Sequence, residues 1–384
     1  MKKVLVSSAL AAALALPAMA FTVYDNDDTK VDLYGSIRGY VGVGSTLDNR
    51  DLYDTGYMLG IQNNSQFGVK FSKDKFKANV EFGAVEPDVA GKDSGTGHRQ
   101  FWGSYDTGAG TFLFGKTNTP TIDDGFITNW LNHDNGLMGF GGIATGKRLI
   151  QLQYQIAGLN VALVEDKTGY GRVGGNQESP RIALSYTIKN EAGKPFVKVA
   201  ASYKYYNSAT IEAGVPAGTS AYHVWVGIKP TFGGSYLSVL AHYGKNGHLY
   251  GEQSTRYSKG GYLLDKLDSA IGLDAQRTGA TMEFGTKMSE DITFIVGAGY
   301  QATFGGKGQK DKVLQDGGLS SFKDSFLHSY ATYVSLPYKL SKNFTFTPQV
   351  TYYHTFEGTS GKGSVMEHRD EKGIVGGARI RWDF

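Results

Sequence analysis

The 384-residue sequence contains no cysteine, which excludes disulfide bonds, zinc–thiolate sites and a thiol nucleophile. Proline is scarce, with 9 residues, and the 53 glycines do not recur at every third position, so a collagen-like chain is excluded. The formal net charge of only +3 gives no basic excess for binding nucleic acid. Mean hydropathy is −0.29, and beyond residue 20 no apolar run of about 18 residues occurs, which excludes a transmembrane helix there.

The first twenty residues have the organisation of a secretory signal peptide. Met1-Lys2-Lys3 is positively charged, residues 4–16 are apolar, and Ala18-Met19-Ala20 is a small-residue cleavage site. The apolar stretch is too short to cross a bilayer as a helix. We therefore predict that residues 1–20 are removed and that residues 21–384 form one domain. Export without disulfides is typical of a bacterial envelope.

From residue 31 onward, apolar residues alternate with polar or small ones. Leu33, Ile37 and Val41 share one face of the first segment, and Ser36 and Arg38 lie on the other. Side chains of a strand point alternately to opposite faces, so each such segment is a strand that is apolar on one side. The predicted strands cover residues 31–44, 64–72, 76–85, 99–106, 111–117, 147–155, 159–166, 180–187, 195–206, 221–229, 234–243, 275–286, 291–301, 326–335, 343–355 and 373–384.

The connections between these sixteen strands alternate in length. Those after even-numbered strands are short, such as 107–110 and 156–158, and those after odd-numbered strands are long and polar, such as 244–274 and 302–325. An even number of antiparallel strands with every long loop at one end is typical of an outer-membrane barrel. Closing the sheet pairs every backbone group, as hydrocarbon requires. The fold class is therefore all-β, a transmembrane antiparallel barrel of sixteen strands.

The last strand has the features of a closing strand. Ile380, Trp382 and Phe384 lie on its apolar face, and Arg379 and Arg381 on the other, with an aromatic residue at the C-terminus. Tyrosines and tryptophans near strand ends, including Tyr243 and Tyr300, are placed where interfacial aromatic girdles lie in membrane barrels. Ordinary strand preference for aromatics is the alternative explanation.

Four stretches resemble the general diffusion porins of Gram-negative outer membranes. They are Val31-Asp32-Leu33-Tyr34-Gly35, Ser65-Gln66-Phe67-Gly68-Val69-Lys70, Gly141-Gly142-Ile143-Ala144-Thr145 and Arg379-Ile380-Arg381-Trp382-Asp383-Phe384. The resemblance implies an outer-membrane homotrimer that passes small hydrophilic solutes and ions passively, without a cofactor. It also implies a third loop folded into the lumen, and a barrel-assembly signal at Trp382 and Phe384.

Residues 118–146 form a connection long enough to be this third loop. These residues include no lysine or arginine. They include three acidic residues, which are Asp123, Asp124 and Asp134. Phe126, Trp130 and Phe140 can pack against a wall. Loops of this length in compact proteins tend to be functional or disordered. We expect the loop to fold inward, with its acids at the pore constriction; a solvated surface loop is the alternative.

Basic residues are expected on the pore wall opposite these acids, where they would give a transverse field and set ion selectivity. The candidates are Arg38, Lys70, Lys116, Arg148 and Arg379. Alternation fixes the inward direction of all except Lys116, which ends a strand, and Arg148, which begins one. Gln66 and His98 stand at two positions where the resembled family usually has arginine. Arg38, Lys116 and Arg148 are therefore expected to supply the basic charge of the pore wall instead.

The sequence therefore predicts a non-specific porin and no enzyme. No P-loop, zinc-protease motif or nucleophile elbow occurs. One alternative is a solute-specific channel for sugars or anions, suggested by aromatics with lumen parity such as Tyr34, Tyr40, Tyr206 and Trp225. Another is a plugged barrel with an adhesive or structural role. Ion selectivity is not determined by the near-neutral overall charge.

Overall fold

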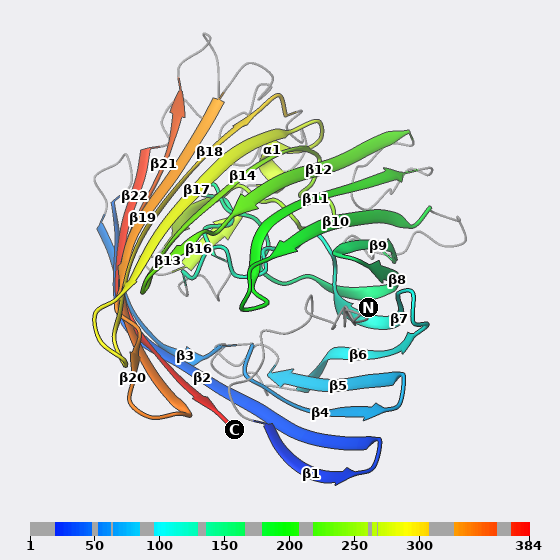
Figure 1. The fold of residues 1–384 in the computed structure, drawn as a ribbon. Coiled ribbons are helices and arrows are strands. Elements are labelled where there is room, and N and C mark those ends of the chain that lie inside the picture. The colour runs from blue at the N-terminus through cyan, green and yellow to red at the C-terminus, as the bar shows by residue number, and fades with distance from the viewer. Residues whose placement is uncertain are drawn as a thin grey trace.

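The computed structural model describes residues 20–47, 53–62, 64–84, 96–129, 136–165, 179–206, 218–259, 263–266, 268–306, 326–358 and 370–384. Their strands form a closed antiparallel barrel (Figure 1). Residues 1–19 of the predicted signal peptide, and Trp130 and Asp134 of the predicted third loop, lie outside the described residues. Within the described part of the chain, no helix is long and apolar enough to cross a membrane.

Sixteen spanning strands build the wall, with β3 and β4 together forming one of them. They are β2 (Thr29–Leu47), β3 (Tyr53–Ile61) with β4 (Gln66–Lys73), β5 (Phe76–Ala84), β6 (Thr96–Asp106), β7 (Thr111–Asn118), β8 (Arg148–Ile156), β9 (Leu159–Val164), β10 (Arg181–Lys189), β11 (Pro195–Tyr206), β12 (Thr219–Ile228), β14 (Ser235–Lys245), β17 (Gln276–Lys287), β18 (Thr293–Phe304), β19 (Phe326–Ser335), β21 (Phe344–Gly358) and β22 (Asp370–Asp383). Each pairs with its sequence neighbour, so the predicted all-β barrel and strand count are confirmed.

The remaining elements are short. Next to the wall lie β1 (Ala20–Asn26), β13 (Thr231–Phe232) and β20 (Tyr338–Lys339). A separate two-stranded hairpin of β15 (Arg256–Lys259) and β16 (Leu263–Lys266), followed by the one-turn helix α1 (Asp268–Ile271), belongs to the connection between β14 and β17.

The barrel closes where β22 pairs with β2. Arg381 lies opposite Arg38 in this register, and the ladder ends with Gly35 and Phe384, which exchange backbone hydrogen bonds of 2.8 and 3.0 Å. Trp382 and Phe384 point outward, 49% and 42% exposed, with ring centroids 5.7 Å apart. The C-terminal residue thus completes both the ladder and the outward aromatic face of the closing strand.

Two wall features differ from the sequence prediction. The second strand is longer than the predicted range 64–72. β4 pairs with residues 29–36 of β2, and β3 extends the same strand by pairing with residues 39–47 of β2. The polar run Asn63-Asn64-Ser65 hides this continuity in the sequence. Strand structure also begins before the predicted residue 31, because β1 forms a hairpin with β2. The turn of this hairpin includes Asp27 at φ 50°.

The two faces of the wall differ in chemistry as the alternation predicts. Large apolar side chains such as Phe67, Leu152 and Val226 are exposed on the outside. Aromatic pairs gather outside near the short-turn ends, including Phe76 with Tyr105 at 4.8 Å. Others gather near the long-loop ends, including Tyr330 with His354 at 5.1 Å. An apolar belt bounded by two aromatic girdles is the surface that a bilayer requires.

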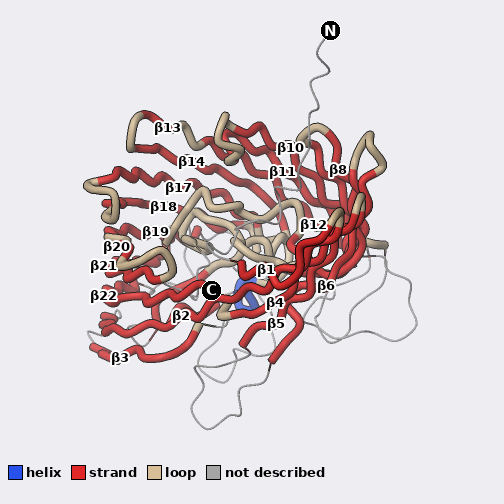
Figure 2. The backbone as a smooth tube through the Cα atoms, turned by 60° about the horizontal axis from the view of Figure 1, so that its bottom comes forward, coloured by secondary structure: helices blue, strands red, loops and turns tan. Residues whose placement is uncertain are grey.

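The inside of the barrel is partly filled by its own connections. Figure 2 shows loop segments within the ring of strands. One is the connection from β7 to β8, described over residues 119–129 and 136–147, which we call the third loop. The other is the connection from β14 to β17, described over residues 246–259, 263–266 and 268–275, which we call the second inward loop.

Candidate functional site

The third loop is closed at its neck by its own backbone. The Thr119 amide donates to the Lys147 carbonyl at 2.9 Å, and the Asp123 amide donates to the Ala144 carbonyl at 2.9 Å. The loop therefore leaves and rejoins the wall at nearly one point. Its length is used to reach across the interior, not to link distant strands.

One half of the loop packs on β11 and β12. Phe126 meets the inward-facing Trp225 edge-on at 5.8 Å between ring centroids, and the Trp225 indole donates to the Thr121 carbonyl at 2.9 Å. Ile143, Ala200 and Leu240 complete this apolar cluster. Burial of these apolar side chains stabilises the inward position of the loop.

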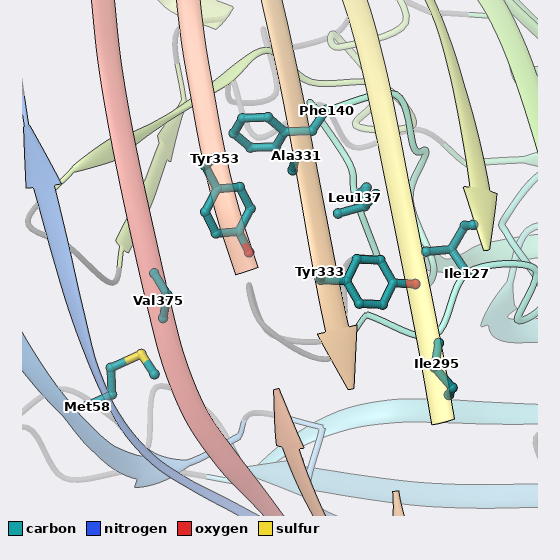
Figure 3. Close-up of a cluster of buried hydrophobic side chains, with 9 residues drawn as sticks. All are labelled: Met58, Ile127, Leu137, Phe140, Ile295, Ala331, Tyr333, Tyr353 and Val375. Atoms are coloured by element: carbon teal, nitrogen blue, oxygen red, sulfur yellow. The ribbon is translucent and has the colours of Figure 1, made fainter. Parts of the chain in front are cut away.

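The other half packs on β18, β19 and β21. Figure 3 shows Ile127, Leu137 and Phe140 of the loop lying along the inward faces of these strands. Phe140 contacts the ring of Tyr353, with centroids 4.9 Å apart. Gly141, at φ +100°, approaches the wall so closely that a Cβ atom would lie 2.2 Å from the Ala280 carbonyl oxygen. Only glycine fits such an approach in this conformation.

A buried carboxylate on β17 anchors the loop between these two clusters. Glu283 accepts hydrogen bonds from the Thr128 amide at 2.7 Å and the Thr128 hydroxyl at 2.8 Å. The hydroxyls of Tyr236, at 2.7 Å, and Tyr333 also donate to it. A carboxylate removed from water needs such donors, so the arrangement fixes Thr128 against the wall.

The described acids of the loop do not both face the open interior. Asp123 is buried, and its Oδ1 accepts hydrogen bonds from the amides of Gly125 at 2.9 Å and Phe126 at 2.6 Å. Burial raises the pKa of Asp123 to about 6, against the opposing effect of the Phe126 amide and of Lys229. The expectation that Asp123 lines the constriction is wrong, because its carboxylate closes a turn within the loop. Asp124 instead forms an ion pair with Lys198 of β11.

On the opposite wall, arginines of β6 and β8 lie near one carboxylate, and an arginine of β2 lies near that of β8. Arg99 donates to Glu81 of β5 at 2.9 Å. Arg148 lies close enough to Arg99, Arg38 and Glu81 to interact electrostatically with all three. Lys70 of β4 is nearby, with its ammonium 4.7 Å from the ring centroid of Tyr34. We call Arg38, Lys70, Arg99 and Arg148 the basic cluster.

Glu81 is the hub of this cluster. Its second oxygen accepts hydrogen bonds from the Tyr34 hydroxyl at 3.0 Å and from Gln100 at 3.2 Å. Glu81 and Arg99 were not among the pore-wall residues predicted from the sequence. Glu81 has inward parity on its strand, which could have identified it. Arg99 faces inward only because the β5–β6 register shifts at Glu81 and Phe82, and a bulge redirects the side chain.

The other expected wall residues divide into two groups. Arg379 lies on the inward face of β22, opposite Tyr40 of β2. Lys116 lies on the outward face, because its register partners Phe101 and Ile150 are 58% and 41% exposed outside the barrel. The expectation that Lys116 belongs to the pore wall is therefore wrong. Its ammonium donates to the His98 carbonyl at 2.5 Å.

Two of the aromatics suggested for solute stacking are covered by loops. Trp225 lies beneath Phe126, and Tyr206 is fully buried with Leu249 and Tyr250 of the second inward loop. Within the described ranges, no group of three or more histidines or acids gathers in a way that could hold a metal ion.

Comparisons with known proteins agree with this geometry. No family model matches the chain. A monosaccharide porin of Halomonas is 34% identical over 109 residues, which are 25% of this chain and 28% of that protein. The chain thus matches little more than a quarter of the length of that relative. The major outer membrane protein P.IB of Neisseria meningitidis serogroup B is 23% identical over 396 aligned positions, covering 100% of this chain and 89% of the relative.

Solved structures share the whole barrel. The channel DcaP of Acinetobacter baumannii matches with a TM-score of 0.60 at 14% identity, covering 94% of this chain and 99% of DcaP. The barrel has the fold of a Gram-negative outer-membrane porin. An anion-selective porin of Comamonas acidovorans matches this porin fold with a TM-score of 0.53 at 15% identity, covering 92% and 100% of the two chains. OmpT of Vibrio cholerae in its trimer form matches with a TM-score of 0.51 at 15% identity, covering 93% of this chain and 100% of OmpT.

The porin fold explains the outward surface described above. Relatives in Halomonas elongata and Neisseria meningitidis are named major outer membrane proteins, so the predicted outer-membrane location is confirmed. The exposed belt of apolar side chains is the lipid-facing surface of such a barrel.

Proposed function

We propose that the protein is an outer-membrane channel for passive diffusion of small hydrophilic solutes and ions, and not an enzyme. The observation that carries this proposal is the third loop, packed on the inner wall through Phe126, Thr128 and Phe140 while the basic cluster occupies the opposite wall. A loop held inside a barrel in this way narrows the lumen without filling it. Charged side chains at such a narrowing decide which ions pass.

The experiment is reconstitution of the purified protein into planar lipid bilayers. We expect ohmic, water-filled conductance. The neck hydrogen bond between Asp123 and Ala144 permits a clean test of the loop, because residues 124–143 can be replaced by Gly-Gly with little strain on the wall. This variant should conduct more than the wild type. Absence of conductance in the wild type would contradict the channel, and an unchanged conductance in the variant would contradict the constriction.

We further propose that the channel favours small anions. The basic cluster places Arg99, Arg148 and Lys70 near the carboxylate of Glu81, with Arg38 close to Arg148. The similar Comamonas barrel is described as an anion-selective porin. A sugar-specific channel, as in the name of the Halomonas relative, receives less support because Trp225 and Tyr206 lie beneath loops. A reversal potential in a salt gradient measures the preference directly.

We infer that the protein assembles as a homotrimer in contact with outer-membrane lipid. The trimer form of the similar Vibrio cholerae barrel supports this assembly. Light scattering of the protein in detergent, corrected for bound detergent, measures the mass of the complex. A mass equal to that of one chain would contradict the trimer.

A further inference from the structure

The second inward loop turns back into the barrel directly after β14. Its neck is closed by the Asn246 amide, which donates to the Ala275 carbonyl at 2.9 Å. Leu249 and Tyr250 then pack on Tyr206 and Ala221 of the inner wall. The sequence predicts a long polar loop here, and nothing in its composition indicates that it enters the lumen.

The same loop continues across the inner faces of the following strands. The Thr255 hydroxyl of the loop lies 3.0 Å from the Thr303 hydroxyl of β18, and the Thr355 hydroxyl of β21 donates to the Arg256 carbonyl at 3.0 Å. Asp268 of α1 pairs with the buried Arg277 of β17 at 2.8 Å. The loop is thus attached at several points between β11 and β21, on the side of the barrel away from the basic cluster.

Glu252 is the point at which the two inward loops meet. Its buried carboxylate forms an ion pair with Arg181 of β10 and accepts a hydrogen bond from the Ser202 hydroxyl of β11 at 2.7 Å. The Thr121 hydroxyl of the third loop donates to the same carboxylate. The Glu252 carbonyl accepts a hydrogen bond from the Ala144 amide at 3.1 Å, at the other side of the third-loop neck.

The ionised state of Glu252 is maintained by its partners. Burial alone would raise its pKa, but the Arg181 guanidinium and the donors from His223 and Thr121 outweigh burial and lower it. A charged carboxylate in a buried site is retained only where its partners satisfy it fully. Removing it takes this one acceptor away from the Arg181 guanidinium and from the Ser202 and Thr121 hydroxyls, all at the junction of the two loops.

We propose that the described residues of the second inward loop, 246–259, 263–266 and 268–275, form a second constriction, and that Glu252 is the positioning residue that holds this loop and the neck of the third loop together. The conducting path is thereby confined to the side of the lumen lined by the basic cluster. This inference rests on the proposed channel function and extends it to a second narrowing element that is joined to the first through Glu252.

The first test removes the loop. The Asn246–Ala275 neck allows residues 247–274 to be replaced by Gly-Gly, and folding is checked by resistance of the barrel to unfolding in unheated detergent gels. We expect a higher single-channel conductance than that of the wild type. If the wild type conducts and the shortened protein conducts equally, the second constriction is wrong while the channel function stands. If only the shortened protein conducts, the loop occludes the lumen and the open-channel function is wrong.

The second test examines Glu252 itself, in the full-length protein. Glu252→Ala should broaden the distribution of conductance levels and increase current noise, because both loops lose their shared anchor. Glu252→Gln keeps the side-chain size and one acceptor oxygen, so its current noise should lie between that of Glu252→Ala and that of the wild type. Glu290→Ala, in an exposed turn, is the matched control and should resemble the wild type. Wild-type noise and conductance in Glu252→Ala would overturn the role of this residue.

Discussion

The guanidinium of Arg99 lies 2.9 Å from the carboxylate of Glu81, although simple alternation along β6 would direct Arg99 toward lipid. The bulge between β5 and β6 turns the side chain inward, and Gly83 leaves the necessary room: a Cβ atom there would lie 2.0 Å from the Arg99 side chain. Arg148 interacts with both members of this pair and with Arg38, so the pair lies at the centre of the positive side of the lumen.

Removing two charges from the basic cluster should shift the channel toward cations. One unit charge about 10 Å from an ion in water changes its energy by about 0.4 kcal/mol, or about twofold in local concentration. Arg38→Ala combined with Arg148→Ala should therefore lower the anion-to-cation permeability ratio about two- to fourfold. The reversal potential in a potassium chloride gradient measures this ratio.

Lys116→Ala is the matched control for that experiment. It removes one positive charge from the same barrel, but from the outward face beside Phe101. The permeability ratio should remain that of the wild type. A shift as large as that of the arginine variant would show that the inward basic cluster is not the source of selectivity.

Neutralising the hub carboxylate should act in the opposite direction. Glu81→Gln preserves side-chain size and keeps one of the two acceptor oxygens that Tyr34 and Arg99 use, but removes the negative charge within the basic cluster. The anion-to-cation permeability ratio should rise about twofold, by the same Coulomb argument. Glu290→Gln, in an exposed turn, serves as the control. An unchanged or lower ratio in Glu81→Gln would count against anion preference arising at this wall.

The turn closed by Asp123 should lose stability as the pH rises through the weakly acidic range. The carboxyl has an ordinary pKa of 3.8 in an open loop and about 6 when the loop is packed, because burial disfavours its charge. The packed loop therefore binds the proton more tightly, and its stability is greatest at low pH, falls between these two values and is constant above them. The shift corresponds to at most about 3 kcal/mol.

Hydrogen exchange at the amides of residues 125–127, corrected for the intrinsic pH dependence, measures this local stability. Protection in the wild type should decrease from pH 4 to pH 6. Asp123→Asn keeps an acceptor oxygen for the Gly125 and Phe126 amides but cannot titrate, so its protection should be independent of pH. Equal pH dependence in the two proteins would contradict the assignment to Asp123.

Closure of the barrel should depend on the contact between Gly35 and Phe384. A Cβ atom at Gly35 would lie 2.3 Å from the Phe384 ring, so Gly35→Ala displaces the ring from the closing ladder. Overpacking of this kind costs about 1–3 kcal/mol. We expect a lower melting temperature and a smaller folded fraction in unheated detergent gels. Phe384→Ala should have a similar effect.

Gly39→Ala is a suitable control, since it lies on the same face of the same strand. The nearest atom to its added Cβ is the Gly60 carbonyl oxygen at 3.5 Å, an ordinary contact. This variant should fold and melt like the wild type. If Gly35→Ala behaves in the same way, the terminal aromatic contact is not needed for closure.

The sequence by itself determined the wall of this protein. Alternation between Leu33, Ile37 and Val41 on one side and Ser36 and Arg38 on the other depends only on strand geometry, which repeats every two residues. Bounds such as those of β11 and β19 agree with their predicted ranges, and the short turns at one end follow from the same pattern. The closing strand with Phe384 was also predicted from alternation alone.

Only the tertiary structure decided what occupies the interior of the barrel. Thr121 and Glu252 are 131 positions apart, and no local pattern indicates that they share a hydrogen bond. Strand register places Lys116 on the outward face, and a bulge directs Arg99 inward. Packing of the third loop places the Asp123 carboxylate within its own turn. Strand direction is set by neighbouring residues along the chain, whereas the path of a loop is set by burial and by polar partners that the fold brings together from distant segments.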